Sequence, residues 1–357
     1  MIRDIRKSSN RSAWLVLGLI ALILISVTAI FIFIGRPPDY GDPPPGLMII
    51  RPPYFVLTLV EQADYIWAGG PYGTVAIDRQ TGELFSPHPD EWPSFDYVNA
   101  LLVDHEGVLW IGHRGGLTRH EGEDWQTFTE DDGLLPGSVK AICETHDGAL
   151  WVGTESGVTR YNGTSWQRFT TDDGLGFLPV DAILEDRDGV LWFGSASLSH
   201  GGLSSYDGAT WSTYSTQDGL AHNSVNDIMQ DSRGILWFAT GFGTRGGASW
   251  LEGNTWGTLT HHDGLAGEKV RSVFEDQERR IWFGSEYDGV AVTDGVNWTI
   301  LTPHDGLAGW EVFEIMQDSD GVMWLGTENG ISRIETVDMV ESAHIDFKYN
   351  VVNAYEQ

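Results

Sequence analysis

A tryptophan recurs at nearly constant spacing along most of the chain, and this repeat constrains the fold more than any other feature. The anchoring residues are 41 to 45 positions apart and are Trp67, Trp110, Trp151, Trp192, Trp237, Trp282 and Trp324. A valine lies twelve residues before six of them, and a glycine lies two residues after six of them. Seven copies in one order indicate a repeated structural unit.

Each unit contains four short segments with a β pattern. In the fourth unit they read VDAIL, VLWFG, LSSY and TWSTY, with Asp-Gly pairs at 188–189 and 207–208 between them. Asp-Gly tolerates the positive φ of tight hairpins, so it suits turns between antiparallel strands. Four strands in about 42 residues are typical of one β-propeller blade. The sequence therefore predicts an all-β, seven-bladed β-propeller over residues 54–357, with the seven tryptophans wedged between adjacent blades.

The two ends of the repeat array are incomplete. The first unit has Phe55 where the valine is expected, and the last unit lacks a fourth strand with a tryptophan. A propeller ring must close, because an open ring would leave strand edges unpaired. The missing strand could come from GLMII, residues 46–50, or from HIDFKYNVV, residues 344–352. We favour the C-terminal segment.

The N-terminal region differs from the rest of the chain in charge and hydropathy. Residues 14–34 are uncharged and, as a helix, would span about 30 Å, the thickness of a bilayer's hydrocarbon core. The flanking residues are basic, so residues 1–36 carry a net charge of +4. We predict a cytoplasmic tail over 1–13, a single transmembrane helix over 14–34, a proline-rich linker over 35–53, and a propeller that is periplasmic or extracellular. A cleaved signal peptide is the alternative, although no small-x-small cleavage site follows the apolar segment.

The overall charge excludes one class of partner. The chain has 51 acidic and 21 basic residues, giving a formal charge of −30, and residues 37–357 alone carry −34. Such an acidic surface repels the phosphates of nucleic acids. We therefore expect no nucleic-acid binding. The single cysteine excludes an internal disulfide framework and a cysteine-based zinc site.

The repeat pattern V-x-x-I-x-x-D-x-x-G-x-L-W-x-G-T, closed by Y-x-x-x-D-G-L, resembles the two-component-regulator propeller repeat. That family forms the periplasmic sensor region of many bacterial hybrid histidine kinases. The resemblance covers about residues 54–335 and implies an extracytoplasmic recognition module. The sequence ends 22 residues after Glu335, so the kinase part of such proteins is not expected here.

Two motifs have simpler interpretations than a ligand site, and we expect no cofactor and no bound metal. Aspartates six residues before the anchoring tryptophans echo the start of calcium loops, but a strand follows directly, so we expect these carboxylates to accept backbone N–H bonds in a turn. Gly241, Gly243 and Gly246 match G-x-G-x-x-G, but a strand follows where a nucleotide site needs a helix. A metal held by several of the loop histidines is an alternative to the metal-free interpretation.

One face of the predicted propeller combines varied loops. Loops between the second and third strands and loops between blades emerge at the same end of the propeller axis, which we call the mouth. Aromatic rings and planar polar groups gathered there suit a polar ligand such as a glycan. The candidate ligand-binding residues are Arg114, Glu155, His200, Phe242, Arg245, Glu286, Tyr287, Trp310 and Glu328.

The function that these features favour is a membrane-anchored, sensor-like module that recognises a ligand or a signalling or periplasmic protein partner, without catalysis. The alternative is a propeller lyase or a glycoside-active enzyme at the same mouth, for which Glu155, Glu286 and Glu328 would supply carboxylates. A structural surface protein that assembles through its acidic rim is a third hypothesis.

Overall fold

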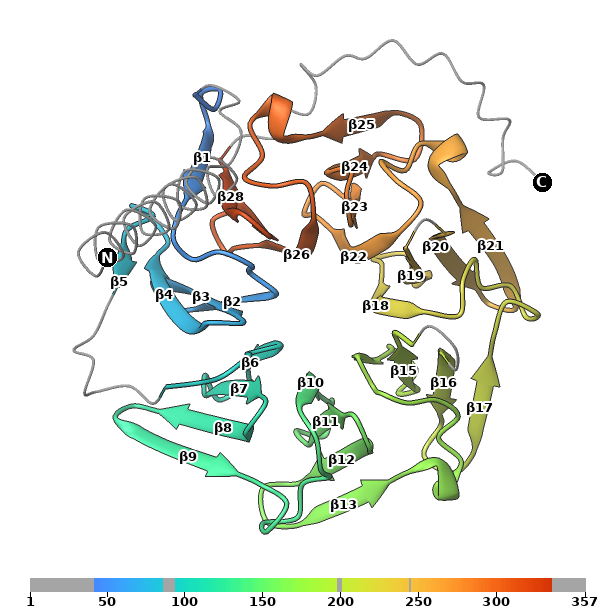
Figure 1. Cartoon of the computed structure of the whole chain (residues 1–357). Helices are drawn as coiled ribbons and strands as arrows, with labels where there is room; N and C mark the ends of the chain where they lie inside the picture. Colours follow the sequence, from blue (N-terminus) through green and yellow to red (C-terminus); the bar gives the residue numbers. More distant parts are fainter. Residues whose placement is uncertain (1–41, 86–93, 198–200, 244, 336–357) are drawn as a thin grey trace, which may run out of the picture. The chain divides into compact units, whose positions relative to one another are not determined.

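Seven four-stranded sheets make up the part of the chain that the structure describes. The computed structural model describes residues 42–85, 94–197, 201–243 and 245–335. Figure 1 shows the sheets arranged as blades around a central axis, with strands such as β6, β10, β18 and β22 innermost. The prediction of an all-β, seven-bladed β-propeller is confirmed.

The blades are numbered 1 to 7 in chain order, and neighbouring strands within each blade are antiparallel. Blades 1 and 2 consist of β2 (Thr58–Gln62), β3 (Tyr65–Gly70), β4 (Gly73–Asp78) and β5 (Leu84–Phe85), then β6 (Ala100–Val103), β7 (Leu109–His113), β8 (Gly116–Glu121) and β9 (Asp124–Phe128). Blades 3 and 4 consist of β10 (Val139–Glu144), β11 (Leu150–Thr154), β12 (Gly157–Tyr161) and β13 (Trp166–Phe169), then β14 (Ala182–Glu185), β15 (Leu191–Ser195), β16 (Gly202–Tyr206) and β17 (Trp211–Tyr214).

The second half of the ring follows the same order. Blades 5 and 6 consist of β18 (Val225–Gln230), β19 (Leu236–Phe242), β20 (Arg245–Glu252) and β21 (Thr255–Leu259), then β22 (Val270–Glu275), β23 (Ile281–Ser285), β24 (Val290–Thr293) and β25 (Trp298–Leu301). Blade 7 consists of β26 (Val312–Gln317), β27 (Met323–Thr327), β28 (Gly330–Ile334) and, outermost, β1 (Leu47–Ile50).

The N-terminal strand β1 closes the ring, which corrects the expectation that residues 344–352 do so. Leu47 pairs with Ile334 and Ile50 with Ile331, so β1 is the fourth strand of blade 7. This strand lies inside the segment 35–53 that was predicted to be only a linker. Residues 344–352 lie outside the described residues. Closure by β1 joins the first strand of the described residues to the last blade, which removes the open edge of β28.

Blade 1 retains the valine of the repeat, one position later than expected. Val56 is 1% exposed and Phe55 is 44% exposed, because the segment from the valine to the tryptophan is one residue shorter in this blade. A Cβ built on Gly326 would lie 2.9 Å from Val56 Cγ1, and one on Gly194 would lie 2.8 Å from Val225 Cγ1. The glycine that lies two residues after six of the seven tryptophans therefore makes room for the valine of the next blade.

The anchoring tryptophans lie between blades, as predicted. Trp192 packs in one buried cluster with Val225, Ile228 and Phe238 of blade 5. Trp282, which is fully buried, packs with Val312 and other residues of blade 7. Each indole is thus part of the interface that joins its blade to the next.

The repeated aspartates shape the turn before five of the seven tryptophans, which confirms the turn interpretation. Asp186 Oδ1 accepts the backbone N–H groups of Asp188, at 3.0 Å, and of Val190, at 2.9 Å. Its Oδ2 accepts the indole N–H of Trp192 at 2.8 Å. The same indole bond recurs at Trp110, Trp237, Trp282 and Trp324. The six-residue spacing of Asp and Trp therefore encodes a buried hydrogen bond, because a buried indole N–H needs an acceptor.

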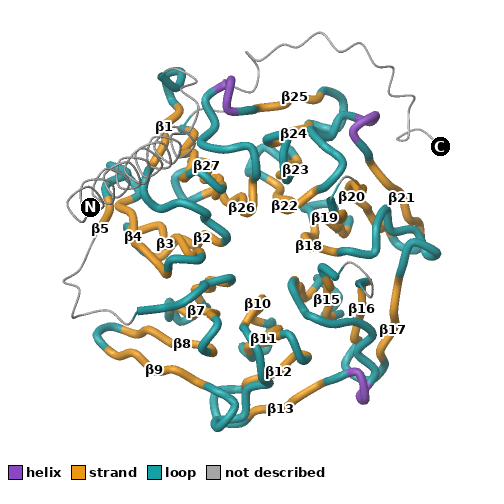
Figure 2. Tube along the Cα trace, in the orientation of Figure 1, coloured by secondary structure: helices purple, strands orange, loops and turns teal. Residues whose placement is uncertain are grey.

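Three blades end in one turn of 3-10 helix, drawn in purple in Figure 2, at Thr171–Asp173, His261–Asp263 and Pro303–Asp305. In the first of them, the Asp173 carboxylate accepts the backbone N–H of Thr170 at 2.8 Å. Gly174 follows with φ of 114°, a conformation that glycine adopts without strain. The Asp-Gly-Leu motif is thus a capped turn that returns the chain to the axis.

The predicted cytoplasmic tail (1–13) and transmembrane helix (14–34) lie outside the described residues. Within the part that the structure describes, no helix has the length and apolar character needed to cross a bilayer.

Candidate functional site

A cavity of about 590 Å³ lies on the propeller axis and is lined by the inner strands of all seven blades. Loop residues complete it at one end, namely Phe55, Pro71, Tyr97 and Ala196. These belong to loops between blades and between second and third strands, so the cavity opens at the mouth that the sequence predicted. Its volume falls within the range of small-molecule sites.

The residue that follows the repeat valine lines this cavity in every blade. These residues are Leu57, Asn99, Lys140, Asp181, Asn226, Arg271 and Phe313. In blades 3, 5, 6 and 7, strand pairing shifts at this position, so the residue lies in a β-bulge between the valine and the next paired residue. A bulge removes one residue from the ladder and redirects its side chain. The chemistry changes from blade to blade while the valine and the fold stay constant.

The two asparagines of this set are fixed by bonds between blades. Asn226 Nδ2 donates to the carbonyl of Val270 at 2.7 Å and to that of Gly241 at 3.2 Å. Asn99 Nδ2 donates to the carbonyl of Val139 at 2.8 Å. Both side-chain carbonyl oxygens therefore have defined orientations beside the cavity.

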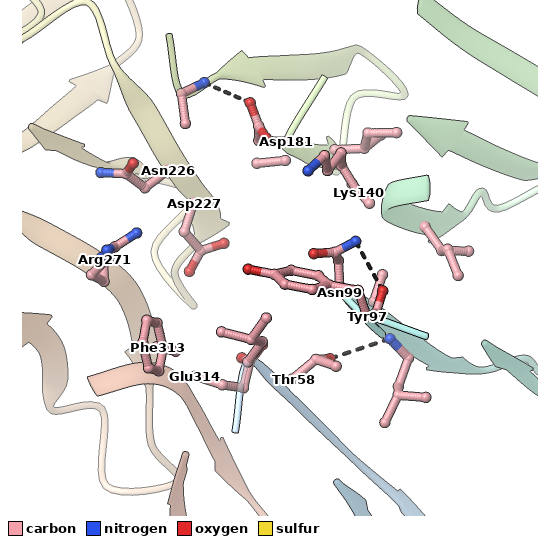
Figure 3. A pocket seen from close by; sticks show the side chains of 18 of the residues that line it. Thr58, Tyr97, Asn99, Lys140, Asp181, Asn226, Asp227, Arg271, Phe313 and Glu314 are labelled. Atoms are coloured by element: carbon pink, nitrogen blue, oxygen red, sulfur yellow. Dashed lines mark hydrogen bonds between the residues drawn. The ribbon is translucent and has the colours of Figure 1, made fainter. Parts of the chain in front are cut away.

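Carboxylates enter the cavity from three blades. Asp227 accepts the backbone N–H of Ile228 at 2.8 Å and that of Val273 at 2.9 Å. Burial raises the pKa of Asp227 to about 6, and burial also raises the pKa of Glu314 well above its ordinary value, with a further contribution from the charge of Asp227. Asp181 accepts the backbone N–H of Ala196 at 2.8 Å, and burial raises its pKa. Figure 3 shows these three side chains around the cavity.

The cations at the cavity wall are paired with acidic groups. Arg271 Nη2 lies 2.8 Å from Glu286 Oε1 and also forms an ion pair with Glu311. Lys269 Nζ, on a residue 5% exposed, lies 3.0 Å from Glu286 Oε2. This network joins blades 6 and 7 at the mouth. Across the cavity, Lys140 Nζ lies 3.9 Å from a Glu155 oxygen.

Tyr97 extends into the cavity from the loop before blade 2, and Figure 3 shows its ring directed toward the middle. Its φ is 56°, which is uncommon for a residue with a Cβ. The Arg114 guanidinium lies 5.3 Å from the ring centroid and forms an ion pair with Asp96 at 2.8 Å. Backbone strain of this kind often marks a functional position.

Of the residues predicted from the sequence, those that the structure describes do not line the cavity. Arg114, Glu155 and Glu286 contact lining residues, as described above. Phe242 and Arg245 pair across the end of the β19–β20 hairpin, which also holds the G-x-G-x-x-G glycines in strand and turn context. Tyr287 is 61% exposed, and His200 lies outside the described residues.

The last two predicted residues, Trp310 and Glu328, are joined by a hydrogen bond in a loop at the mouth. Glu328 accepts the backbone N–H groups of Trp310 and Glu311, each at 2.9 Å. Of the three carboxylates proposed for glycoside chemistry, Glu328 is therefore engaged in positioning a loop, and Glu286 is engaged by Lys269 and Arg271. The assignment of the nine residues as ligand contacts remains a prediction.

The sequence contained a signal for the cavity that loop length did not reveal. Within the repeat, the positions one and two residues after the valine vary from blade to blade, although the flanking valine and isoleucine positions stay apolar. Polar residues at such positions, for example Lys140, Asp181 and Asp227, interrupt a segment that otherwise reads as a buried strand.

Asp227 gives a testable pH dependence. Its folded-state pKa of about 6 exceeds its ordinary 3.8, so the folded state binds the proton more tightly, and stability falls as pH rises from about 4 to 6. The shift corresponds to roughly 3 kcal/mol of unfolding free energy.

Asp227→Asn should therefore reduce the loss of stability between pH 4 and pH 7, as measured by urea unfolding at both pH values. The exposed change Glu123→Gln is the control; equal pH profiles for Asp227→Asn and wild type would contradict the assignment.

A second cavity, of about 500 Å³, lies at the opposite ends of the inner strands of blades 2 to 4. His105 forms an ion pair with Glu144, and His146 Nδ1 lies 2.7 Å from Glu185 Oε2. The hydrogen bond and charge of Glu144 raise the pKa of His105. Both imidazoles are mostly exposed, and the same two carboxylates accept the backbone N–H groups of the two histidines. These contacts join neighbouring blades.

The family model described as "Two component regulator propeller" matches residues 133–156, 174–197, 219–242, 264–287 and 309–329. Four of the five matches begin at the glycine of the Asp-Gly-Leu motif and the fifth begins three residues after it, at Gly309; each includes the first two strands of one blade. No curated protein matches the sequence.

Solved structures that resemble the chain share its fold at low sequence identity. The extracellular domain of a hybrid two component system from B. thetaiotaomicron has a TM-score of 0.72 and 18% identity, over 85% of this chain and 42% of that one. The chain thus spans less than half of that domain. Virginiamycin B lyase from Staphylococcus aureus, solved with quinupristin, has a TM-score of 0.61 and 13% identity, over 82% of this chain and 99% of that one. YCF48 bound to D1 peptide has a TM-score of 0.60 and 15% identity, over 84% of this chain and 97% of that one.

The family matches and the strand pattern agree residue by residue. Each match contains the repeat valine and the anchoring tryptophan of its blade, and in four of the five matches that valine lies beside the glycine of the preceding blade. The chain is therefore a seven-bladed β-propeller, and its blades 3 to 7 contain matches to the two-component regulator propeller repeat.

Proposed function

We propose that the protein is a membrane-anchored, extracytoplasmic recognition module whose ligand binds in the axial cavity, without catalysis. The observation that carries this proposal is the cavity itself, because each blade contributes a side chain to it from one repeat position. A constant frame with variable residues at the axis is the arrangement that a binding protein needs. The lining supplies aromatic rings, amides and both signs of charge, which suits a polar small ligand or a polar segment of a partner.

Two independent lines of support favour this location. The apolar segment 14–34 with basic flanks fits a membrane anchor with a cytoplasmic N-terminus. The structurally similar domain from B. thetaiotaomicron is an extracellular domain of a two component system. In this proposal the propeller lies outside the cytoplasm and passes its ligand state to a partner protein.

A direct test is a thermal-shift screen of the full chain in detergent against glycan fragments, amino acids, amines and short peptides. A ligand at 100 times its Kd should stabilise the protein by about 2.7 kcal/mol. Two double variants then locate the site. Lys140→Ala with Phe313→Ala alters the cavity, and Arg245→Ala with Tyr287→Ala alters the loop residues outside the cavity lining, here called the outer mouth. Loss of binding in the first double variant supports the cavity, and loss only in the second moves the site to the outer mouth. Equal binding by wild type and both variants would contradict the proposal.

A propeller lyase is the second candidate function, because the virginiamycin B lyase structure is matched over 99% of its length. The discriminating experiment is incubation of the protein with quinupristin, followed by chromatography. Turnover that Asp227→Asn abolishes would replace the recognition function by catalysis at the same cavity.

A further inference from the structure

Two carboxylates face the axial cavity without a cation opposite them. Asp227 on β18 and Glu314 on β26 occupy the same repeat position, two residues after the valine, in blades 5 and 7. Neither forms an ion pair with a lysine, arginine or histidine of the described residues, and backbone N–H groups are the donors that reach them. When ionised, these two carboxyl groups are therefore left with partial compensation only.

The cationic side chains that line the same cavity form ion pairs with other carboxylates. Arg271, between these two carboxylates in chain order, pairs with Glu286 and Glu311. Lys140 lies near Glu155, and its charge offsets part of the rise that burial causes in the pKa of Asp181. Of the cavity's acidic groups, Asp227 and Glu314 are thus the pair whose charge the described residues do not balance.

The placement of the two carboxylates favours an elongated ligand over a metal ion. Within the described part of the chain, no three histidine, cysteine, aspartate or glutamate side chains are grouped closely enough to hold a metal. The two groups belong to blades 5 and 7, with the inner strand of blade 6 between them. Tyr97, whose ring is directed into the cavity in Figure 3, adds a hydroxyl oxygen that can accept a hydrogen bond.

We propose that the axial cavity binds a small organic dication, with one ammonium group at Asp227 and the other at Glu314. The proposal rests on the proposed recognition function and names its ligand class. Each ammonium group offers three donors and a full charge, so it forms charge-assisted bonds to carboxylates in a site of low dielectric. The propeller's acidic surface raises the local concentration of such cations and so speeds their capture.

The test compares three ligands of the same carbon count and different charge: 1,5-diaminopentane, 1,5-pentanediol and glutarate. Binding to the full chain in detergent is measured by isothermal titration calorimetry and by thermal shift at neutral pH and moderate salt. We expect 1,5-diaminopentane to bind and raise the melting temperature, while the diol and the dianion have no effect.

Matched variants separate the cavity from general attraction to an acidic surface. Asp227→Asn and Glu314→Gln should each weaken diamine binding at least tenfold, a change of about 1.4 kcal/mol. Glu123→Gln removes one exposed charge outside the cavity and should leave the affinity unchanged. Melting curves without ligand verify that each variant is folded, and loss of a charge at Asp227 is not expected to destabilise the protein at neutral pH.

Each outcome of these measurements either supports the diamine proposal or overturns it. Diamine binding that the cavity variants weaken and Glu123→Gln does not supports the proposal. Equal weakening by all three variants assigns the effect to the surface field and overturns it, as does preferential binding of glutarate or no binding of the diamine. In these last cases a different ligand found by the screen, lost in the Lys140→Ala and Phe313→Ala protein, would still support the recognition function.

Discussion

Replacing Trp282 by alanine is expected to lower the free energy of unfolding by about 3–5 kcal/mol, the range for large-to-small changes at buried aromatic positions. Trp282 is fully buried and packs in the cluster that joins blades 6 and 7. Its indole N–H donates to Asp276 Oδ2 at 2.7 Å, so the change also leaves a buried carboxylate with one donor fewer. Urea unfolding followed by tryptophan fluorescence and circular dichroism measures the loss.

Two controls separate packing from the hydrogen bond. Trp282→Phe keeps a ring in the interface and removes the donor, so it should cost about 1–3 kcal/mol, less than alanine. Tyr287→Ala, at a side chain that is 61% exposed, should be close to neutral. Wild-type stability of Trp282→Ala together with loss of ligand binding would show that the tryptophan serves the site and not the blade interface.

A chain that begins at Tyr54 should be much less stable than one that begins at Asp42. The shorter chain lacks β1, and with it the buried side chains of Leu47 and Ile50. Burial of two such residues contributes about 3–6 kcal/mol, to which the backbone bonds of the strand pair are added. It also lacks Arg51, whose Nη2 donates to the carbonyl of Ala308 at 2.7 Å. Thermal unfolding of the two proteins, with light scattering to detect association, makes the comparison.

The expected result for the shorter chain is a lower melting temperature together with association through the exposed edge of β28. Met48→Ala in the longer chain is the control, because this β1 side chain is exposed and its loss leaves the strand pairing intact. Equal stability of the two chains would mean that a segment other than β1, such as residues 344–352, can complete blade 7.

The candidate site shows how far sequence patterns reach. The mouth face could be predicted from loop variation, because the loops of one face of a propeller converge. The cavity lining was missed, since its side chains come from inner strands that read as apolar segments with single polar interruptions. Asp227 faces the cavity because the neighbouring Asn226 leaves the ladder in a bulge, and strand pairing rather than residue type shows that bulge.

The sequence by itself determined the blade count, the strands and the turns, because the contacts that define them are local. The Asp–Trp hydrogen bond joins residues six apart, and the capped Asp-Gly-Leu turn joins residues three apart. Tertiary structure alone decided which end of the chain closes the ring and which side chains meet at the axis. Leu47 pairs with Ile334 and Asp227 acts on the pKa of Glu314 across large sequence separations. A repeat pattern constrains each blade and its neighbour, but contacts between distant blades exist only once the ring has closed.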